Sequence, residues 1–432
     1  TLDRSSAASD VYKRQLIGLP IASIATTAQG VLIPHFYSHV LLPTQYVIYG
    51  PYISQLYITW QYTSVTAMYY ALLEGQVQLL DGTPGSLLTP SDISGLEHNP
   101  YISVYDQPTY SFIFLQFNFK YYPENNTYFR WAFASMINPV EVEQEVLEGG
   151  ALGQPIPYYF SPSVYTPYEN PQTLYEITQI YLQHESYNLT RAVEYLKLAG
   201  LKYNPSLGEW TYPNGTPLTI TIYLQEDFYN CPAWESVIES AAQQLNLTKN
   251  IEIIPYLPEQ LTSILQQQNY DIINFGWLDV VYLAADYYFI FGPLAPVVAF
   301  NDFLNSTIDQ LLTEAYVEAH TFSQVVNYTD QALIDLQYTE PYVIFGWTEC
   351  IEAAYTNGYY GFVASSGLGY TDTLNDVHQG LTTNGTLSYV IGTSGYAPPN
   401  FNIYFDNFYS SEEIWEYFFP SPLTTLPDNP FQ

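Results

Sequence analysis

Positively charged side chains are scarce in this chain of 432 residues. It carries 9 Lys plus Arg against 42 Asp plus Glu, which gives a formal net charge of −33 at pH 7. No Lys or Arg follows Lys249. Proteins that bind DNA or RNA neutralise the phosphates with clustered Lys and Arg. The sequence therefore argues against a nucleic-acid partner.

Charged residues of both signs are few as well, at 12% of the chain, which is less than a salt-adapted surface would carry. Near pH 3 most carboxyl groups are protonated, and the positive charge is limited to the 9 basic residues and the 6 His. So small a charge limits the self-repulsion that unfolds proteins in acid. The sequence supplies neutral polar groups instead, including 45 Tyr. We expect a protein that works in an acidic medium.

Cysteine is nearly absent, with only Cys231 and Cys350. The pair forms either one disulfide outside the cell or two inert buried thiols, since the sequence alone cannot place their Cα atoms. Seven N-x-S/T sequons favour a glycosylated, extracellular surface location; they lie at Asn125, Asn188, Asn214, Asn246, Asn305, Asn327 and Asn384.

Long hydrophobic runs are also missing, because no segment reaches the ~18–20 apolar residues of a membrane span. Residues 1–15 contain Arg4, Lys13 and Arg14 and resemble translated sequencing adapter, so we exclude them from the fold. Residues 16–30 are apolar and then small, typical of the remnant of a secretory signal peptide; the alternative is a buried strand. We expect a cell-surface protein whose membrane anchor was lost with a missing terminus.

The remaining sequence mixes strand and helix patterns, which predicts a layered α/β fold. Residues 64–74 have helical spacing and stop at Gly75, and Asn138-Pro139 predicts a capped helix start. ISVYDQP and YSFIFLQFN predict two strands before Asn118. GEWTYPNGTPLTITIYL predicts a hairpin around an Asn-Gly turn. A later strand and helix series up to Trp277 predicts a sheet rich in parallel strands.

An ordered series of segments carries a family resemblance. The segments are MYYALLEGQVQLLDG, SFIFLQFN, FRWAFASMINPVEVEQEVLEGGALGQPIP, TRAVEYLKLAG, YDIINFGWLDVVYLAADYYF, NSTIDQLLTEA and EPYVIFGW. Together they resemble the oligopeptide- and dipeptide-binding (family 5) extracellular solute-binding proteins of ABC transporters, in a form suited to an archaeal acidophile. The resemblance implies a two-lobed periplasmic-binding-protein-like α/β fold with mixed sheets and a ligand cleft between the lobes.

The resemblance also implies a domain organisation. Lobe I is expected to contain residues 31–118, lobe II residues 119–350, and residues 351–384 are expected to return to lobe I. Residues 385–432 look like the first strand and helix of lobe I, which this family places at the start. Either the fold is circularly permuted, which neighbouring termini permit, or a second copy begins near residue 385. A hinge is expected near Asn118 and again near 345–365.

In related proteins that bind peptides, an acid in the loop after the Gly-Trp strand holds the amino terminus of the ligand. Here Asp279 and Asp286 follow Trp277; each is otherwise a helix cap or a solvated acid. A cleft with so few cations favours ligands without a clamped carboxylate, held on aromatic faces. The candidate ligand-binding residues are Asn118, Trp277, Asp279, Asp286, Tyr288 and Trp347. The expected ligand is an oligopeptide, with a neutral oligosaccharide as the alternative, and the expected partner is the membrane permease of an ABC importer.

Enzyme motifs are absent: the chain has no G-x-S-x-G sequence, no P-loop and no paired Cys motif. His35 and His39 stand four residues apart, but no third ligand is near and Pro34 favours an extended segment. We therefore expect no enzyme activity, no metal and no cofactor. A structural surface-layer protein is the alternative from another functional class.

Overall fold

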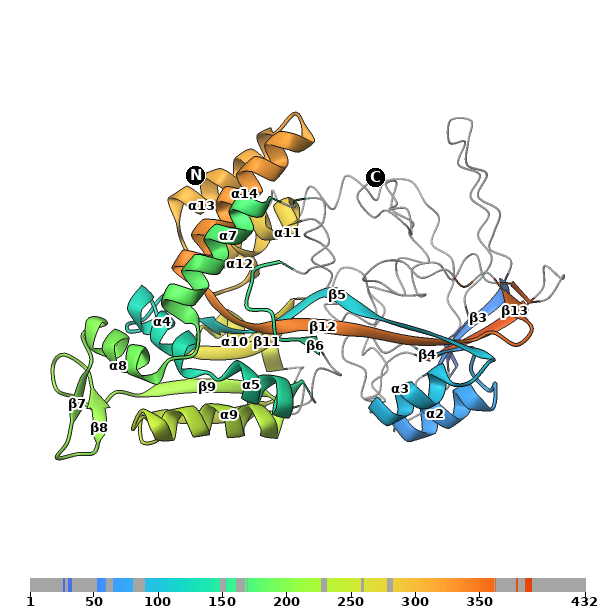
Figure 1. Ribbon diagram of the computed structural model, residues 1–432, viewed down its shortest axis with the longest axis horizontal. Coiled ribbons are helices and arrows are strands. Elements are labelled where there is room, and N and C mark those ends of the chain that lie inside the picture. Colours follow the sequence, from blue (N-terminus) through green and yellow to red (C-terminus); the bar gives the residue numbers. More distant parts are fainter. Residues whose placement is uncertain are drawn as a thin grey trace.

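The structure is a computed structural model (Figure 1). It describes residues 26–27, 30–32, 53–59, 65–80, 90–147, 153–160, 168, 170–226, 231–257, 260–277, 283–360, 362, 378–379 and 385–390. The expected adapter segment and nearly all of the expected signal remnant lie outside these residues, as do His35 and His39. Within the described residues, no helix is long and apolar enough to cross a membrane.

One mixed sheet organises the described chain. Its strands are, in spatial order, β1 (Thr26–Thr27), β2 (Gly30–Leu32), β3 (Ile53–Thr59), β15 (Gly385–Val390), β4 (Leu79–Leu80), β12 (Tyr342–Tyr355), β5 (Ile102–Phe117), β11 (Ile272–Trp277), β9 (Ile220–Gln225) and β10 (Ile251–Tyr256), and β6 (Gly153–Gln154) pairs with β12. Strands β9, β10 and β11 are parallel to one another, whereas β5 and β12 run antiparallel to their neighbours. The mixed α/β fold class expected from the sequence is confirmed.

Two long strands connect the two ends of this sheet. β5 and β12 pair along their whole length, from Tyr342 opposite Gln116 to Tyr355 opposite Ile102. One end of the pair lies beside β4 and the other beside β11, and Figure 1 shows the pair crossing between two groups of helices. The register shifts twice on the way, between Ile344 and Gly346 and between Trp347 and Glu349. Such bulges bend a strand and increase its twist.

The end of the β5–β12 pair beside β4 belongs to the smaller lobe, in which two helices pack below the strands (Figure 1). They are α2 (Val65–Leu73) and α3 (Pro90–Glu97), and their core includes Met68, Leu72, Leu96 and Ala353 of β12. The helix predicted over residues 64–74 is confirmed. It ends at Leu73, and Gly75 follows with a φ of +69°, a left-handed conformation that glycine adopts without strain.

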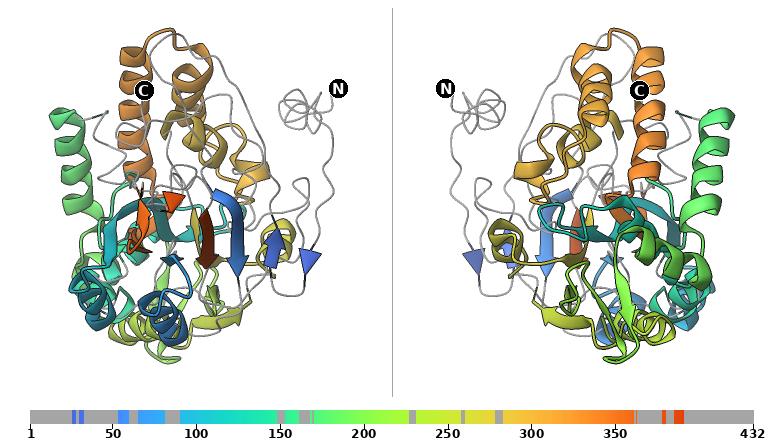
Figure 2. Two further views of the ribbon diagram at one scale, coloured as in Figure 1. Left: turned by 90° about the vertical axis from the view of Figure 1, so that its right-hand side faces the viewer. Right: turned by 90° about the vertical axis from the view of Figure 1, so that its left-hand side faces the viewer.

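The larger lobe covers its sheet with helices on both faces, and Figure 2 shows the two layers from the ends of the molecule. One layer contains α4 (Thr127–Met136), α5 (Pro139–Glu141), the π-helix η1 (Val142–Val146), α8 (Leu189–Leu198) and α9 (Cys231–Gln244). The other contains α7 (Pro171–Ile180), α10 (Leu261–Gln267), α11 (Leu283–Ile290), α12 (Ala295–Val298), α13 (Ser306–Thr313), the π-helix η6 (Glu314–Glu318) and α14 (Phe322–Thr339). A third π-helix, η4 (Tyr181–Glu185), continues α7 toward the first layer.

Asparagine caps account for several helix starts in this lobe. The predicted cap at Asn138 is confirmed, since its side chain accepts a hydrogen bond from the Val140 backbone and Pro139 is the first helical residue. Asn126, Asn170, Asn188 and Asn305 cap other helices in the same way. Each such cap satisfies a free N–H group and stabilises its helix by about 0.5–2 kcal/mol.

Two strand predictions need correction. ISVYDQP and YSFIFLQFN form the single strand β5, because Pro108 lies opposite Glu349 at a bulge, where the missing N–H is tolerated. The predicted hairpin contains its turn, but β8 (Glu209–Thr211) pairs with β7 (Lys202–Asn204) and β9 enters the main sheet. Only an isolated bridge joins the two arms of that hairpin.

Strand β15 lies between β3 and β4. It is parallel to both, with Leu387 opposite Leu56 and Val390 opposite Leu80. It therefore belongs to the same sheet as β5. A separate two-stranded sheet joins β13 (Tyr359–Tyr360) to β14 (His378–Gln379).

Candidate ligand site at the crossing strands

A row of three aromatic residues crosses the sheet where the long strands leave the larger lobe. Phe112 of β5 lies opposite Trp277 of β11 on one side and opposite Trp347 of β12 on the other. Directly opposed residues of neighbouring strands point to the same face of a sheet. The two tryptophans predicted from sequence are therefore brought together around a phenylalanine that the sequence analysis did not single out.

Trp347 forms the buried end of this row. It is fully buried, its ring centroid lies 4.9 Å from that of Phe112, and its indole N–H donates to the Tyr158 carbonyl at 3.0 Å. The backbone of the same residue pairs with Gln154 of β6. Trp347 thus packs against Phe112 inside the protein, and in this conformation its ring is not accessible to a ligand.

Trp277 is the partly exposed end of the row and the last residue of β11. Its indole N–H donates to the Tyr342 hydroxyl at 3.4 Å, and Asn301 donates to the same oxygen at 3.4 Å. The Tyr342 ring stacks on Phe114 with centroids 4.2 Å apart. These contacts fix the orientation of Trp277, and the residue remains partly exposed.

Tyr342 is held in turn by Tyr159, another residue that sequence reasoning missed. The Tyr159 hydroxyl donates to the Tyr342 carbonyl at 2.7 Å and accepts from the Tyr342 backbone N–H at 2.9 Å, while the Tyr287 hydroxyl donates to the Tyr159 carbonyl. Burial raises the pKa of both Tyr159 and Tyr342 well above the ordinary value. The two hydroxyls therefore stay neutral hydrogen-bonding groups that anchor the start of β12.

The predicted residues Asp286 and Tyr288 lie on α11, which follows Trp277 along the chain. Both are half-buried. The Tyr288 ring packs beside Tyr316 of η6, with centroids 5.2 Å apart. The Asp286 charge, after burial, helps raise the pKa of Tyr168 to about 12. Asp279 lies outside the described residues.

Asn118 lies at the end of β5 in the larger lobe. It is fully buried and its amide donates to the carbonyls of Gln268 and Tyr270, at 3.1 and 2.9 Å. Its side-chain oxygen accepts from the Lys120 backbone N–H at 3.2 Å. In this conformation the side chain secures the end of the strand.

The sequence matches a known protein family. The sequence model described as "Bacterial extracellular solute-binding proteins, family 5 Middle" matches residues 51–293, more than half of the chain. The chain belongs to this family. The matched range contains β5, β11 and α11, and hence Phe112, Trp277 and Tyr288.

Solved structures share the fold. The oligopeptide-binding protein AppA of Bacillus subtilis, solved with a nonapeptide, is 15% identical with a TM-score of 0.56, over 73% of this chain and 59% of that one. DppA of Helicobacter pylori with the peptide STSA is 16% identical with a TM-score of 0.60, over 82% and 61%. AgaA of A. tumefaciens R10 with agropinic acid is 20% identical with a TM-score of 0.60, over 82% and 66%.

This family 5 chain thus spans about three fifths of the length of the first two of these proteins. No curated protein matches it by sequence. Family 5 proteins are binding proteins of transport systems. At these identities the structural likeness shows a shared fold, the two-lobed fold of this family.

Several basic residues of the described part donate hydrogen bonds to oxygen atoms of neutral groups. Lys120 donates to the Gln268 side chain at 3.2 Å and Lys249 to the Leu207 carbonyl at 2.8 Å. Arg191 donates to the carbonyls of Leu182 and Gln183. None of these contacts places a cation beside Trp277, consistent with a ligand site that lacks a carboxylate clamp.

Cys231 of this family 5 chain is a free, buried thiol, and the side chain of Cys350 lies outside the described residues. Burial, aided by Glu235 and Glu226, raises the pKa of Cys231 to about 11. A protonated buried thiol is unreactive. In the part of the chain that the structure describes, no group of three or more His, Cys, Asp or Glu could hold a metal ion.

Proposed function

We propose that this chain is the extracellular, ligand-capturing component of an ABC importer. It would deliver oligopeptides to the membrane permease of that importer. The observation that carries the proposal is the family match over residues 51–293, combined with an aromatic row at the crossing strands. The proposed role is capture and delivery, without chemical change of the ligand.

A peptide ligand fits the chemistry of this row. Trp277 is a partly exposed aromatic residue, so a peptide can be held on its ring without Lys or Arg. In acid the terminal carboxyl of a peptide, with a pKa near ~3.5, is partly neutral and needs no cation. The amino terminus would be held by Asp279 or Asp286. Peptide complexes of AppA and DppA support the same ligand class.

A neutral oligosaccharide remains the second candidate, because sugars also stack on Trp and Tyr faces. The AgaA complex with agropinic acid illustrates that this fold accommodates ligands other than ordinary peptides. Among the described residues, the side-chain contacts of Lys120, Arg191 and Lys249 lie away from Trp277, which favours a neutral ligand of either kind.

Lobe closure is proposed to bend the long strands at the two bulges of β12. These bulges lie at Phe345 and Thr348, and the first falls at the start of the expected hinge region 345–365. The expected hinge at Asn118 is less favourable, since its hydrogen bonds bind it to Gln268 and Tyr270 within the larger lobe. We place the moving segment on the smaller-lobe side of Gly346.

The position of β15 supports the permuted arrangement over a second copy. A strand at residues 385–390 lies in the smaller-lobe sheet between β3 and β4, as expected if this segment supplies the first strand of lobe I. We propose that residues 385–432 belong to lobe I.

The ligand class is tested by a thermal-shift screen of oligopeptides and neutral oligosaccharides at pH 3–5, because a ligand raises the melting temperature by mass action. We expect peptides to raise it and Trp277→Ala to abolish most of that rise. If Asp279→Asn together with Asp286→Asn leaves peptide affinity unchanged, the amine anchor is wrong. If only a sugar shifts the melt, the oligosaccharide candidate replaces the peptide.

A further inference from the structure

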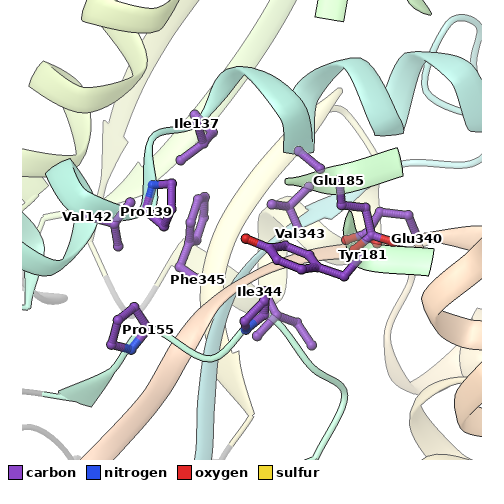
Figure 3. A pocket seen from close by; sticks show the side chains of 12 residues that line it. Ile137, Pro139, Val142, Pro155, Tyr181, Glu185, Glu340, Val343, Ile344 and Phe345 are labelled. Atoms are coloured by element: carbon purple, nitrogen blue, oxygen red, sulfur yellow. The ribbon is translucent and has the colours of Figure 1, made fainter. Parts of the chain in front are cut away.

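Two glutamates meet inside the larger lobe. Glu185 is the last residue of η4, and Glu340 follows α14 directly before β12 begins. Glu185 and Glu340 are 4% and 2% exposed, and their carboxyl groups lie close enough for one to donate a hydrogen bond to the other when it is protonated. Figure 3 shows both at one end of a pocket beside Tyr181.

The hydrogen bonds around the pair do not account for all of its oxygens. Gln337 donates to Glu185 Oε2 at 2.5 Å and also to the Pro157 carbonyl at 3.2 Å. Among the described residues, Glu185 Oε1 and Glu340 Oε2 have no hydrogen-bond partner. Ionised carboxylates only accept hydrogen bonds, so two of them cannot bond to each other unless one carries a proton.

The nearby arginines do not replace that proton. Arg130 donates to the backbone carbonyls of Glu124, Thr339 and Glu340 and to the Thr127 hydroxyl. Arg191 donates to the carbonyls of Leu182, Gln183 and Ser186 and to the hydroxyls of Ser135 and Ser186. Both lie close enough to act on the pair through their charge, but neither donates a hydrogen bond to the carboxyl oxygens of the pair.

The other titratable side chains near the pair are tyrosines and the histidine that precedes Glu185 on η4. Tyr159 and Tyr181 face the pair, and Tyr158 lies beside Tyr181. His184 is turned toward Tyr195, to which its Nδ1 is bonded at 2.8 Å, and its ring stacks on Trp131. Of these groups, none supplies a cation to the two carboxyls.

We propose that Glu185 and Glu340 form a proton-binding latch, in which a proton held by Glu340 and donated to Glu185 fastens η4 to the start of β12. The latch joins three segments, because Gln337 adds the Pro157 backbone to the same cluster. Since β12 crosses between the lobes, the latch determines how firmly this strand is anchored in the larger lobe.

Burial is the main cause that raises the pKa of Glu185, to about 8, and the pKa of Glu340 well above the ordinary value, with the charge of Glu185 adding to the latter. The protonated pair is therefore present in acid and at neutral pH. When both carboxyls have lost their protons in alkali, two like charges face each other and must separate. The adjacent cavity of about 50 Å³, lined by Tyr181 and both glutamates, gives water access to the separated charges.

The test compares Glu340→Gln and Glu185→Gln with the exposed Glu194→Gln on α8 as control. The glutamine amide at 340 donates to the Glu185 carboxylate without a titrating proton, so this variant is expected to fold. Two quantities are measured: the infrared absorption of protonated carboxyl groups at pH 7, and the pH dependence of unfolding by urea between pH 5 and pH 8. We expect Glu340→Gln to lose one protonated carboxyl and about one linked proton, and Glu194→Gln to lose neither.

The latch is overturned if Glu340→Gln retains the infrared signal and the pH dependence of Glu194→Gln. If neither latch variant folds, the infrared spectrum of Glu124→Gln is measured instead. Glu124 is another deeply buried glutamate with a raised pKa, and the substitution removes its contribution to the protonated carboxyl signal. A protonated carboxyl signal that persists at pH 7 and disappears above about pH 8 supports the latch. Its absence at pH 7 overturns it.

Discussion

At the scale of single residues, buried carboxyl groups replace the ion pairs that a chain with few cations cannot form. Glu124, Glu185 and Glu340 are each at most 4% exposed, and Glu124 has no hydrogen-bond partner at either side-chain oxygen among the described residues. A buried carboxyl without a paired cation is far less costly as the neutral acid. The low content of Lys and Arg thus leaves buried carboxyl groups without a paired cation, and these groups favour the protonated form.

Glu124→Gln tests this at one residue. Burial, followed by the charge of Asp271, raises the pKa of Glu124 to about 8 from 4.5. The folded state therefore retains a proton that the unfolded state releases above pH 4.5, so stability from this group is complete below that pH and is lost as the pH rises toward 8. We expect the variant to reduce the slope of unfolding free energy between pH 5 and pH 7 by about 1.4 kcal/mol per pH unit.

Urea unfolding at pH 5, 6 and 7 measures this slope, with the exposed Glu145→Gln as the matched control. Equal slopes for Glu124→Gln and Glu145→Gln would mean that Glu124 is ionised in the folded protein.

The two tryptophans of the aromatic row are expected to respond differently to truncation. Trp347→Ala removes a fully buried side chain and its bond to Tyr158, which destabilises the fold by about 3–5 kcal/mol. Trp277→Ala removes a partly exposed ring, so it should cost less stability and lower ligand affinity instead. Thermal melts and ligand titrations separate the two effects. A larger stability loss for Trp277→Ala would contradict this assignment.

At the scale of elements, the sequence predicted local structure well and strand pairing poorly. The helix ending before Gly75 and the cap at Asn138 follow from residues close together in the chain, and both are confirmed. β5 was predicted as two strands because Pro108 ordinarily interrupts a strand, and the bulge that accommodates it is formed by a segment far away in sequence. Phe112 was missed for the same reason, since its partners Trp277 and Trp347 are defined only by register.

Strand β15 offers an element-scale prediction. Leu387→Pro removes a backbone donor and restricts φ in a strand that has neighbours on both sides. We expect a loss of about 3 kcal/mol or more in unfolding free energy, and little change for Leu387→Val as control. Chemical denaturation measures both. If Leu387→Pro is as stable as the control, residues 385–390 do not belong to the sheet of the smaller lobe.

At the scale of the whole molecule, two lobes share one sheet through β5 and β12, and the aromatic row lies where these strands leave the larger lobe. The family and the two-lobed class could be recognised from the order of segments along the chain. The Glu185–Glu340 pair could not, because its members are separated by most of the larger lobe and no sequence pattern links Glu185 to the segment EPYVIFGW that begins at Glu340. Folding, and not sequence spacing, brings such groups together.

The central claim is that this family 5 chain captures a peptide by closing its lobes, and small-angle X-ray scattering tests it most directly. The radius of gyration is measured at pH 4 with and without a saturating pool of random tetrapeptides. Closure at the bulges of β12 predicts a smaller radius and a shorter maximum dimension with peptide, and no change with Trp277→Ala. Identical scattering of the parent protein with and without the peptide pool would contradict the claim.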